Sequence, residues 1–372
     1  MIIKKPPMGW NTWNTFMGSI NEQMVKESAD AFISEGLRDA GYQYVVIDDC
    51  WSEKRRDENE RLVPDHEKFP NGMKAVGDYI HSLGLKFGMY SAMGVRTCAG
   101  YPASFDREFL DAETFASWGV DYLKYDGCYF MPYINQELMY QRMGVALENC
   151  GRDIVYAVCN GGEADVWTWI RSTGAHLFRS TCDIFDNFKS YYDIAMSQKD
   201  KFAFSAANCY NDVDMLTVGI YGKGKVGAGC TESEYRQQFV LWCMYCAPLM
   251  LGCDIRSMDK ATKELVTNRE LIAIDQDEAN RPPIWQQHRW NQDLRCAFKH
   301  LAKGYAVAFY NFADYDSNVQ CYFDAVGIPV GSHMKLRLTD VFTGECIGDF
   351  RDYAEIAVPR HDVKLYRAEL VK

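Results

Sequence analysis

The chain has 372 residues, a formal net charge of -11 at pH 7 and 48% hydrophobic residues. That is enough for one large core and a smaller second domain. The acidic balance argues against nucleic-acid binding, because no basic excess is present to neutralise phosphates. No apolar run approaches the roughly 18 residues of a membrane span. The first residues lack the apolar core of a signal peptide, which predicts a cytoplasmic location.

Apolar or β-branched runs alternate with helical patterns from residue 8 onward. In the first expected helix, Val25, Phe32 and Leu37 share one face, and Ser19 and Glu22 have capping-box spacing. The second has its apolar stripe over 73–83 and is closed by Gly84. Strands are expected at 44–48, 86–90, 121–125, 153–158 and 176–179, with weaker candidates at 8–10, 202–206 and 247–252.

Eight β-then-α units in this span predict an α/β fold, a (β/α)8 TIM barrel over residues 1–280. A doubly wound open sheet is the alternative, but it would normally carry a Gly-rich turn after its first strand. The sequence has Trp-Asn-Thr-Trp-Asn at 10–14 instead. From 281 to 372 the alternating runs at 306–311, 335–338 and 357–359 predict a small antiparallel β-sandwich domain.

Polar side chains gather where the expected barrel strands end, which is where barrel active sites lie. A single Asp after a strand is usually a helix N-cap. Several acids at one rim would repel one another unless they had a function, so the set favours a site. The residues are Asp48, Asp49, Tyr90, Lys124, Asp126, Cys159, Asn160, Arg179, Asp183, Asp212 and Asp214.

Two chemistries fit such a rim. Carboxylates hold magnesium in metal-dependent barrel lyases. A pair of carboxylates about 5–5.5 Å apart instead hydrolyses glycosides with retention of configuration. Aromatic residues at the expected mouth (Trp10, Trp13, Trp51 and Tyr90) favour sugar stacking, so we expect no metal and no cofactor.

Four motifs, at 8–13, 47–51, 124–128 and 211–215, closely resemble the α-galactosidase and α-N-acetylgalactosaminidase family, glycoside hydrolase family 27. The likeness extends to 247–249 and 273–277. It implies a retaining exo-glycosidase that releases terminal α-linked D-galactose through a covalent glycosyl-enzyme intermediate. The substrate would be a small galactoside or oligosaccharide, and the sequence is compatible with a homo-oligomer.

The resemblance implies a role for each matching position. Asp126 corresponds to the nucleophile and Asp183 to the general acid/base. Asp48 and Asp49 correspond to the acids that hold the 4- and 6-hydroxyls. Further substrate-binding positions are Trp13, Tyr90, Lys124, Cys159, Asn160, Arg179 and Asp214. We expect Lys124 to keep Asp126 ionised, and crowding by neighbouring acids to keep Asp183 protonated.

Most of the fourteen cysteines lie in apolar runs and are expected to be buried free thiols, which an intracellular location would keep reduced. The resemblance implies one disulfide near the site, Cys98–Cys128. Cys50 matches another bridged position, but Gly18 stands where its partner would be.

The sequence departs from the family pattern after Cys159, where Asn160-Gly161-Gly162 replaces a bulkier pair. A roomier sugar 2-position would admit an N-acetyl group, so α-N-acetylgalactosaminidase activity is an alternative unless Trp167 or Trp169 refills the space. β-L-Arabinopyranosidase activity is another, although Asp48-Asp49 favours full galactose. A metal-dependent lyase and a non-catalytic sugar-binding protein are remote alternatives. Ala92 stands where relatives commonly carry Asp.

Overall fold

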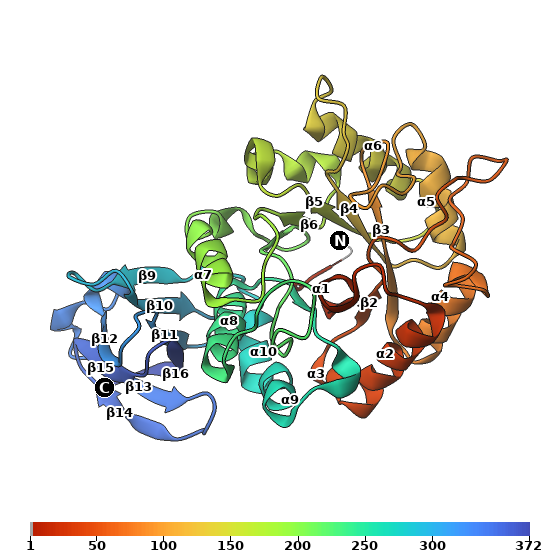
Figure 1. Ribbon diagram of the computed structural model, residues 1–372. Helices are drawn as coiled ribbons and strands as arrows, with labels where there is room; N and C mark the ends of the chain where they lie inside the picture. The colour runs from red at the N-terminus through yellow and green to blue at the C-terminus, as the bar shows by residue number, and fades with distance from the viewer. Residues whose placement is uncertain (1–2) are drawn as a thin grey trace. The chain divides into compact units, whose positions relative to one another are not determined.

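The computed structural model describes residues 3–372 (Figure 1). Its contacts divide the chain into two compact units. The first comprises Met1–Gly229 and Pro248–Asp259, and the second comprises Cys230–Ala247 and Lys260–Lys372. The domain boundary predicted at residue 280 stays a prediction.

Eight parallel strands form the frame of the first unit. They are β1 (Met8–Asn11), β2 (Tyr44–Val46), β3 (Lys86–Ala92), β4 (Tyr122–Asp126), β5 (Val155–Cys159), β6 (Leu177–Arg179), β7 (Tyr210–Asp212) and β8 (Leu249–Leu251). Their order is β7-β6-β5-β4-β3-β2-β1-β8, so each strand pairs with the next and β1 pairs with β8. Leu216, just after β7, bridges in parallel to Leu251 and closes the ring. The predicted barrel is confirmed.

Helices connect these strands. They are α1 (Trp13–Phe16), α2 (Glu22–Ser34), α3 (Leu37–Ala40), α4 (Gly72–Ser82), α5 (Glu108–Ser117), α6 (Gln136–Glu148) and α7 (Phe188–Ser197), with 3-10 turns at Glu163–Thr168, Ile170–Thr173, Phe202–Phe204 and Ile255–Ser257. Figure 1 shows α2, α4, α5 and α6 on the outside of the ring. The stripe of α4 is buried, and Gly84 follows its end with φ +73°, as predicted.

The predicted capping box at the start of α2 is wrong. Asn21 is the N-cap, and its side chain accepts a hydrogen bond from the Met24 amide. Glu22 turns to Lys26 and Asn71 instead. Asn caps a helix as well as Ser does, so the shift of two positions from Ser19 to Asn21 has no energetic obstacle.

The strand predicted at 202–206 is also wrong, because Phe202–Phe204 is a 3-10 turn and β7 begins at Tyr210. The short strand β7, Tyr210-Asn211-Asp212, carries little apolar signal. What specifies β7 is its parallel pairing with β6, in which Leu177 lies opposite Tyr210 and Arg179 opposite Asp212. Such pairing is a tertiary effect that a local pattern does not contain.

Side chains from the strands fill the barrel interior. This cluster includes Tyr44, Val46, Tyr122, Val155, Ala157, Leu177, Tyr210, Met215 and Met250, with Trp13 packed against it. Because side chains alternate along a strand, the residues two positions further along the same strands also point inward. The core layer thus directs Lys124 and Asp126, which follow Tyr122 on β4, toward the barrel axis.

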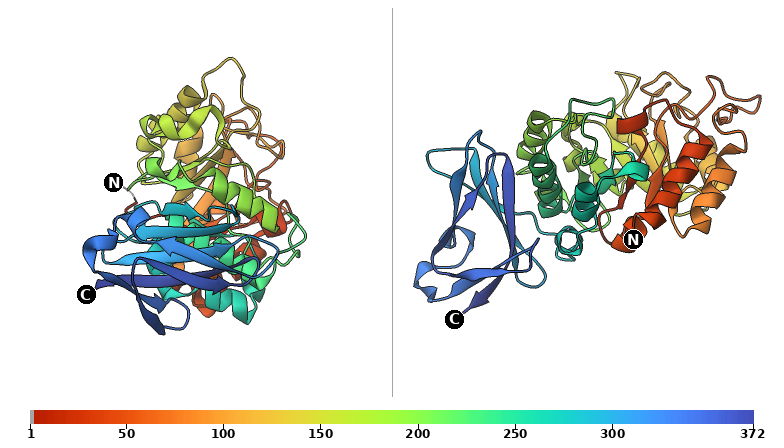
Figure 2. Two further views of the ribbon diagram at one scale, coloured as in Figure 1. Left: turned by 90° about the vertical axis from the view of Figure 1, so that its left-hand side faces the viewer. Right: turned by 60° about the horizontal axis from the view of Figure 1, so that its bottom comes forward.

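The second unit contains α8 (Glu232–Tyr245), α9 (Lys260–Val266), α10 (Arg269–Asp275) and eight strands. The strands are β9 (Ile284–Gln287), β10 (Leu294–His300), β11 (Tyr305–Asn311), β12 (Ser317–Tyr322), β13 (Lys335–Asp340), β14 (Cys346–Phe350), β15 (Tyr353–Val358) and β16 (Asp362–Val371). They form an antiparallel sheet in the order β14-β13-β16-β11-β10-β9 and a two-stranded sheet, β12-β15. These strands are blue in Figure 2. A shared core between the two sheets, including Phe298, Phe309, Cys321 and Leu338, confirms the predicted antiparallel domain.

Cysteines behave largely as predicted. Cys98 and Cys128 form a disulfide with their Cα atoms 5.2 Å apart, and most of the others are buried thiols, including Cys243 and Cys246. Cys182 and Cys346 are exposed. Gly18 lies beside the Cys50 thiol, at the place of the missing second bridge. Among residues 3–372, no helix has the length and apolarity required to cross a membrane.

Candidate active site

The barrel register brings the predicted strand-end residues to one level. Asp126 lies opposite Cys159 on β5, Cys159 lies opposite Arg179 on β6, and Arg179 lies opposite Asp212 on β7. On the other side, Lys124 lies opposite Tyr90 on β3. Parallel pairing thus converts positions scattered over more than a hundred residues into one continuous rim.

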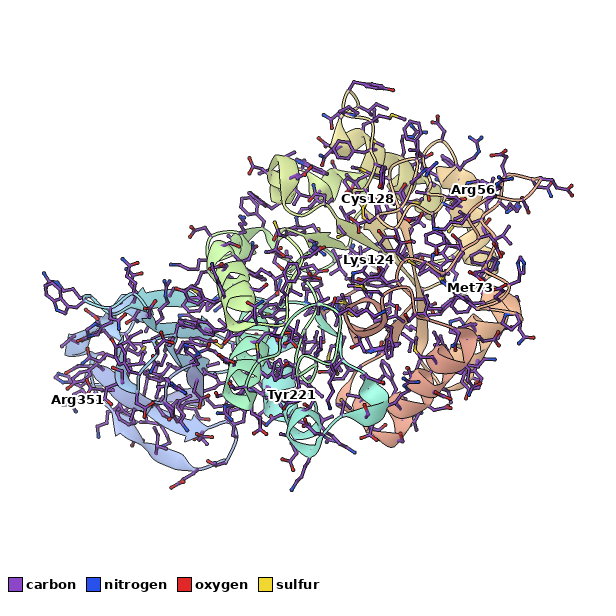
Figure 3. All side chains as sticks on the ribbon, viewed as in Figure 1. Arg56, Met73, Lys124, Cys128, Tyr221 and Arg351 are labelled. Atoms are coloured by element: carbon purple, nitrogen blue, oxygen red, sulfur yellow. A yellow bond between two sulfur atoms is a disulfide. The ribbon has the colours of Figure 1, made fainter. Side chains whose placement is uncertain are left out.

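A pocket of about 290 Å³ opens at this rim. Lys124, which lines it, lies toward the middle of the barrel (Figure 3). The predicted residues that line the pocket are Trp13, Asp48, Asp49, Tyr90, Cys98, Lys124, Asp126, Arg179, Asp183 and Asp214. The structure therefore brings together both proposed catalytic acids and most of the proposed sugar ligands.

Asp48 and Asp49 are buried carboxylates whose positions are fixed by hydrogen bonds. Asp48 accepts from the Lys124 ammonium at 2.8 Å and from the Asn11 amide at 2.7 Å. Asp49 accepts from the backbone N–H groups of Cys50 and Ala99. Burial raises the pKa of Asp49, and these two backbone bonds oppose that rise. Each carboxylate retains acceptor capacity for a ligand hydroxyl.

Lys124 forms its ion pair with Asp48. The sequence instead predicts that it acts on Asp126. Burial lowers the pKa of Lys124, but the charges of Asp48 and Asp126 raise it more, so the group stays an ammonium. Lys124 therefore interacts with Asp126 through its charge, while its hydrogen bond goes to Asp48.

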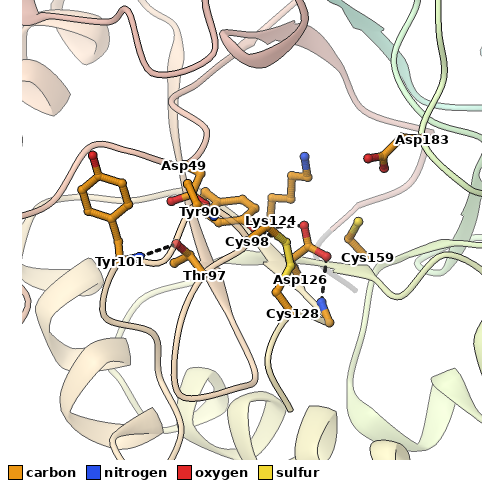
Figure 4. Close-up of a disulfide and its surroundings, with 12 residues drawn as sticks. Asp49, Tyr90, Thr97, Cys98, Tyr101, Lys124, Asp126, Cys128, Cys159 and Asp183 are labelled. Carbon is orange, nitrogen blue, oxygen red and sulfur yellow. Dashed lines mark hydrogen bonds between the residues drawn. A yellow bond between two sulfur atoms is a disulfide. The ribbon is translucent and has the colours of Figure 1, made fainter. Parts of the chain in front are cut away.

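Asp126 takes its hydrogen bonds from other groups. The Tyr90 hydroxyl donates to Oδ2 at 3.0 Å, and the Gly127 amide donates to Oδ1 at 2.7 Å. Burial raises the pKa of Tyr90 well above its usual value, and the charge of Asp126 adds to the effect, so Tyr90 remains a donor. Figure 4 shows Asp126 beside the Cys98–Cys128 disulfide, with Lys124 and Asp183 bordering the same opening.

Asp183 differs from the sequence expectation. Burial raises its pKa, but the charge and the hydrogen bond of Arg179 lower it more, so the net pKa is below its usual value. The expected crowding by acids fails because the nearest charged partner is a guanidinium. A lowered pKa disfavours the protonated form, so a sugar that weakens the contact with Arg179 would help Asp183 to hold a proton.

Arg179 and Asp214 form the rest of this wall. The Arg179 guanidinium lies 3.4 Å from Asp214 and also donates to the Thr181 carbonyl. Asp214 accepts from the backbone amides of Ile184 and Met215, and its own backbone is left-handed at φ +77°. A non-glycine residue in this region is strained, which is frequent at functional sites. Asp214 thus links β7 to the loop that carries Asp183.

A second cavity of about 20 Å³ adjoins the pocket and shares Lys124, Arg179 and Asp214 with it. It has room for roughly one water molecule. Asp212 lines this cavity, and its Oδ1 accepts from the Asp214 amide. Burial and the neighbouring charge of Asp214 raise the pKa of Asp212 to about 6. Sequence reasoning placed Asp212 at the rim without giving it a role.

Asp212→Asn should stabilise the protein at neutral pH. The folded pKa is raised, so the ionised carboxylate destabilises the fold progressively as pH rises through about 4 to 6. The amide keeps the acceptor and removes the charge, for an expected gain of about 1–2 kcal/mol near pH 7.5. Thermal unfolding at about pH 7.5 and pH 4 measures this. An equal shift in Tm at both pH values would contradict the charge explanation.

Two of the predicted substrate ligands lie outside the main pocket lining. Cys159 lines the small cavity instead. The Asn160 side chain forms hydrogen bonds within its own loop. Its Nδ2 donates to the Glu163 carbonyl and its Oδ1 accepts from the Gly162 amide. Gly161 and Gly162, which follow Asn160, have positive φ, a backbone conformation that favours glycine.

The tryptophans proposed to refill the space do not line the pocket. Trp169 stacks on Tyr140 and Trp167 lies under the Lys201 ammonium. Likewise, Trp10 and Trp51 are not stacking platforms at the mouth. Both are buried, with indole N–H groups donating to the carbonyls of Cys253 and Tyr90. Trp13 and Tyr90 are the two predicted aromatic residues in the lining.

Metal binding has little support in the described residues. One group of potential ligand atoms, from Cys98, Asp126 and Cys128, is close enough to hold an ion. Two of its three members are joined in a disulfide, which removes their thiolates.

Several lining residues were not among the site residues predicted from the sequence. They are Asn14, Met17, Ile184, Phe185, Met215, Lys225 and Val226. Lys225 and Val226 belong to the Gly-rich stretch at 222–227. Phe185 could have been found from the sequence, because a large apolar residue two positions beyond Asp183 in a polar loop suggests a binding surface.

Comparisons with known proteins agree with this geometry. A family model described as alpha galactosidase A matches residues 5–277, and one described as the alpha galactosidase C-terminal beta sandwich domain matches residues 291–368. The α-galactosidase of Coffea arabica is 40% identical over 97% of this chain and 93% of its own length. That of Cyamopsis tetragonoloba is 47% identical over 73% of this chain, an alignment that spans 64% of that protein.

Among solved structures, α-galactosidase I from Mortierella vinacea superposes with a TM-score of 0.92. It is 32% identical, and the match covers 98% of this chain and 97% of that one. Family models cover most of the chain, and both of its folded parts match in order. The chain is a glycosidase and belongs to the α-galactosidase (melibiase-type) family, glycoside hydrolase family 27.

Proposed function

We propose that the protein releases terminal α-linked D-galactose from small galactosides or oligosaccharides with retention of anomeric configuration. The observation that carries the proposal is the pocket itself, which holds Asp126 and Asp183 together with the anchored pair Asp48 and Asp49. Two carboxylates on one sugar-sized pocket are the requirement of retaining glycoside hydrolysis. The relatives named above are α-galactosidases, which supports galactose as the sugar.

In the first chemical step, an Asp126 oxygen attacks the anomeric carbon while the bond to the leaving oxygen breaks. Asp183 transfers its proton to that oxygen, so the aglycone leaves as a neutral alcohol. The hydrogen bond from Tyr90 holds the Asp126 carboxylate in place, and Lys124 stabilises its charge before attack.

Binding prepares Asp183 for this step. The charge and the hydrogen bond of Arg179 lower the pKa of Asp183 in the free protein. A sugar hydroxyl that accepts from Arg179 would withdraw part of that interaction, and exclusion of water would further favour the neutral acid. In the second step Asp183 takes a proton from water, the water oxygen attacks the anomeric carbon, and Asp126 is released.

The anchored acids give a reason for selectivity toward galactose. Asp48 and Asp49 are buried, so a sugar that places no hydroxyl against them leaves their acceptors unpaired. L-Arabinopyranose lacks the hydroxymethyl group that Asp49 is proposed to hold. α-N-Acetylgalactosaminidase activity is the second candidate, because the described side chains of Asn160, Trp167 and Trp169 leave the predicted 2-position unfilled.

The test compares kcat/KM on nitrophenyl α-galactoside, α-N-acetylgalactosaminide and β-L-arabinopyranoside. We expect the α-galactoside to be preferred over the β-L-arabinopyranoside by about 100-fold, since the missing 6-hydroxyl leaves a buried carboxylate unpaired. A preference for the N-acetylated substrate would support the second candidate. Preference for the arabinopyranoside would contradict the role given to Asp49.

A further inference from the structure

Phe185 is a large apolar side chain that is 54% exposed although it lines the proposed active-site pocket. It lies two residues beyond Asp183, the group proposed to protonate the leaving oxygen. Exposed apolar side chains that line a ligand site offer flat contact surface that water hydrates poorly. The mechanism described above makes no use of it.

The main chain around Phe185 is held in place from three sides. The Ile184 amide donates to Asp214, the Phe185 amide donates to the Ser190 hydroxyl at 2.8 Å, and the Asp186 amide donates to the Val226 carbonyl. Consecutive bonded amides leave this segment little conformational freedom. The ring is therefore presented to solvent by a fixed backbone, which reduces the entropy lost when a ligand packs against it.

The pocket lining divides into two zones by chemistry. The inner zone carries buried charged groups such as Asp48, Lys124 and Arg179, which suit the hydroxyls of one sugar. The outer lining contains Met17, Phe185 and Lys225, with the Lys225 ammonium near the Ser19 hydroxyl. An apolar ring with a cation nearby suits a second pyranose, which presents a C–H face and a hydroxyl edge.

We propose that Phe185 is a specificity-determining residue whose ring packs against the leaving group and favours leaving groups that contain a ring over small ones. The placement follows from the reaction geometry, because the leaving oxygen must meet Asp183 and the aglycone continues from that oxygen past the same loop. This inference rests on the proposed galactosidase function and adds the substrate's other half to it.

The experiment measures kcat/KM for melibiose, in which galactose is linked to glucose, and for methyl α-galactoside, which has no second ring. Phe185→Ala should lower kcat/KM for melibiose about tenfold, the size of one lost aromatic packing contact. The loss for the methyl galactoside should be much smaller, so the ratio of the two values falls. Phe185→Trp should restore the ratio.

The matched control is Phe204→Ala. Phe204 is also an exposed phenylalanine of the first unit, but it does not line the pocket. Its replacement should change neither substrate. Equal losses on both substrates for Phe185→Ala, or an unchanged ratio, would overturn the inference while leaving the galactosidase proposal intact. Failure of the unaltered protein to cleave either galactoside would instead refute the proposed function.

Discussion

Asp126→Asn should lower kcat on nitrophenyl α-galactoside by about 10⁴-fold, since an amide cannot form the glycosyl-enzyme bond. Asn keeps the oxygen that accepts from the Gly127 amide, and its volume is nearly that of Asp. The fold should therefore survive, and galactose should still bind in calorimetry. Turnover within about tenfold of the unaltered protein would contradict the nucleophile assignment.

Two further variants make this result specific. Asp193→Asn is the matched control, because Asp193 is an exposed acid on α7 that pairs with Lys189 and does not line the pocket. Its kinetics should not change. Asp126→Gly with added azide should regain part of the turnover and give the β-galactosyl azide, since a small anion then attacks in place of the carboxylate and inverts the centre once.

Asp183→Asn should reduce kcat/KM for methyl α-galactoside by about 10²–10⁴-fold, the usual contribution of a general acid. Dinitrophenyl α-galactoside should lose much less, because its leaving group departs without a proton. The contrast between the two leaving groups is the measurement. Equal losses on both would indicate that Asp183 serves binding or folding and not proton transfer.

The pH profile gives a second reading of the same residue. Arg179 lowers the pKa of Asp183 in the free protein, and the acid must be protonated to act. For a poor leaving group, kcat/KM should therefore fall as pH rises from the acid side. The alkaline decline should disappear in Asp183→Asn. A profile that stays unchanged in this variant would assign the titration to another group.

Much of this architecture is predictable from the sequence because it depends on local patterns. Buried strands of β-branched residues, such as 44–46 and 153–158, and helices closed by glycine, such as α4 with Gly84, repeat often enough to identify a barrel. Strand-end positions such as Asp126 and Lys124 follow from that count alone. The specific roles came from motif resemblance.

What the sequence could not supply depends on tertiary contacts. β7 at Tyr210–Asp212 exists because β6 pairs with it, and three mostly polar residues carry no apolar signal of their own. Trp10 and Trp51 have the flat aromatic rings on which sugars stack, yet both are buried and donate their indole N–H groups to backbone carbonyls. The charge on Asp183 depends on whether an acid or Arg179 is nearest, which chain order does not reveal.

The position of the Phe185 ring is a further feature that the sequence alone does not predict. A phenylalanine between two aspartates in a loop could pack inward, and only the bonded amides of Ile184, Phe185 and Asp186 show that the loop holds the ring out at the pocket. Asn160 is the opposite case, because a strand-end amide that suggests a ligand is used up by its own loop.

The central claim is that the pocket hydrolyses α-galactosides through two displacements at the anomeric carbon, with Asp126 as the nucleophile. Proton NMR of the reaction with nitrophenyl α-galactoside, recorded before the product mutarotates, tests this directly. The account predicts that α-galactose appears first and that the β-anomer grows in later. Initial release of β-galactose would mean a single displacement and would contradict a nucleophilic Asp126.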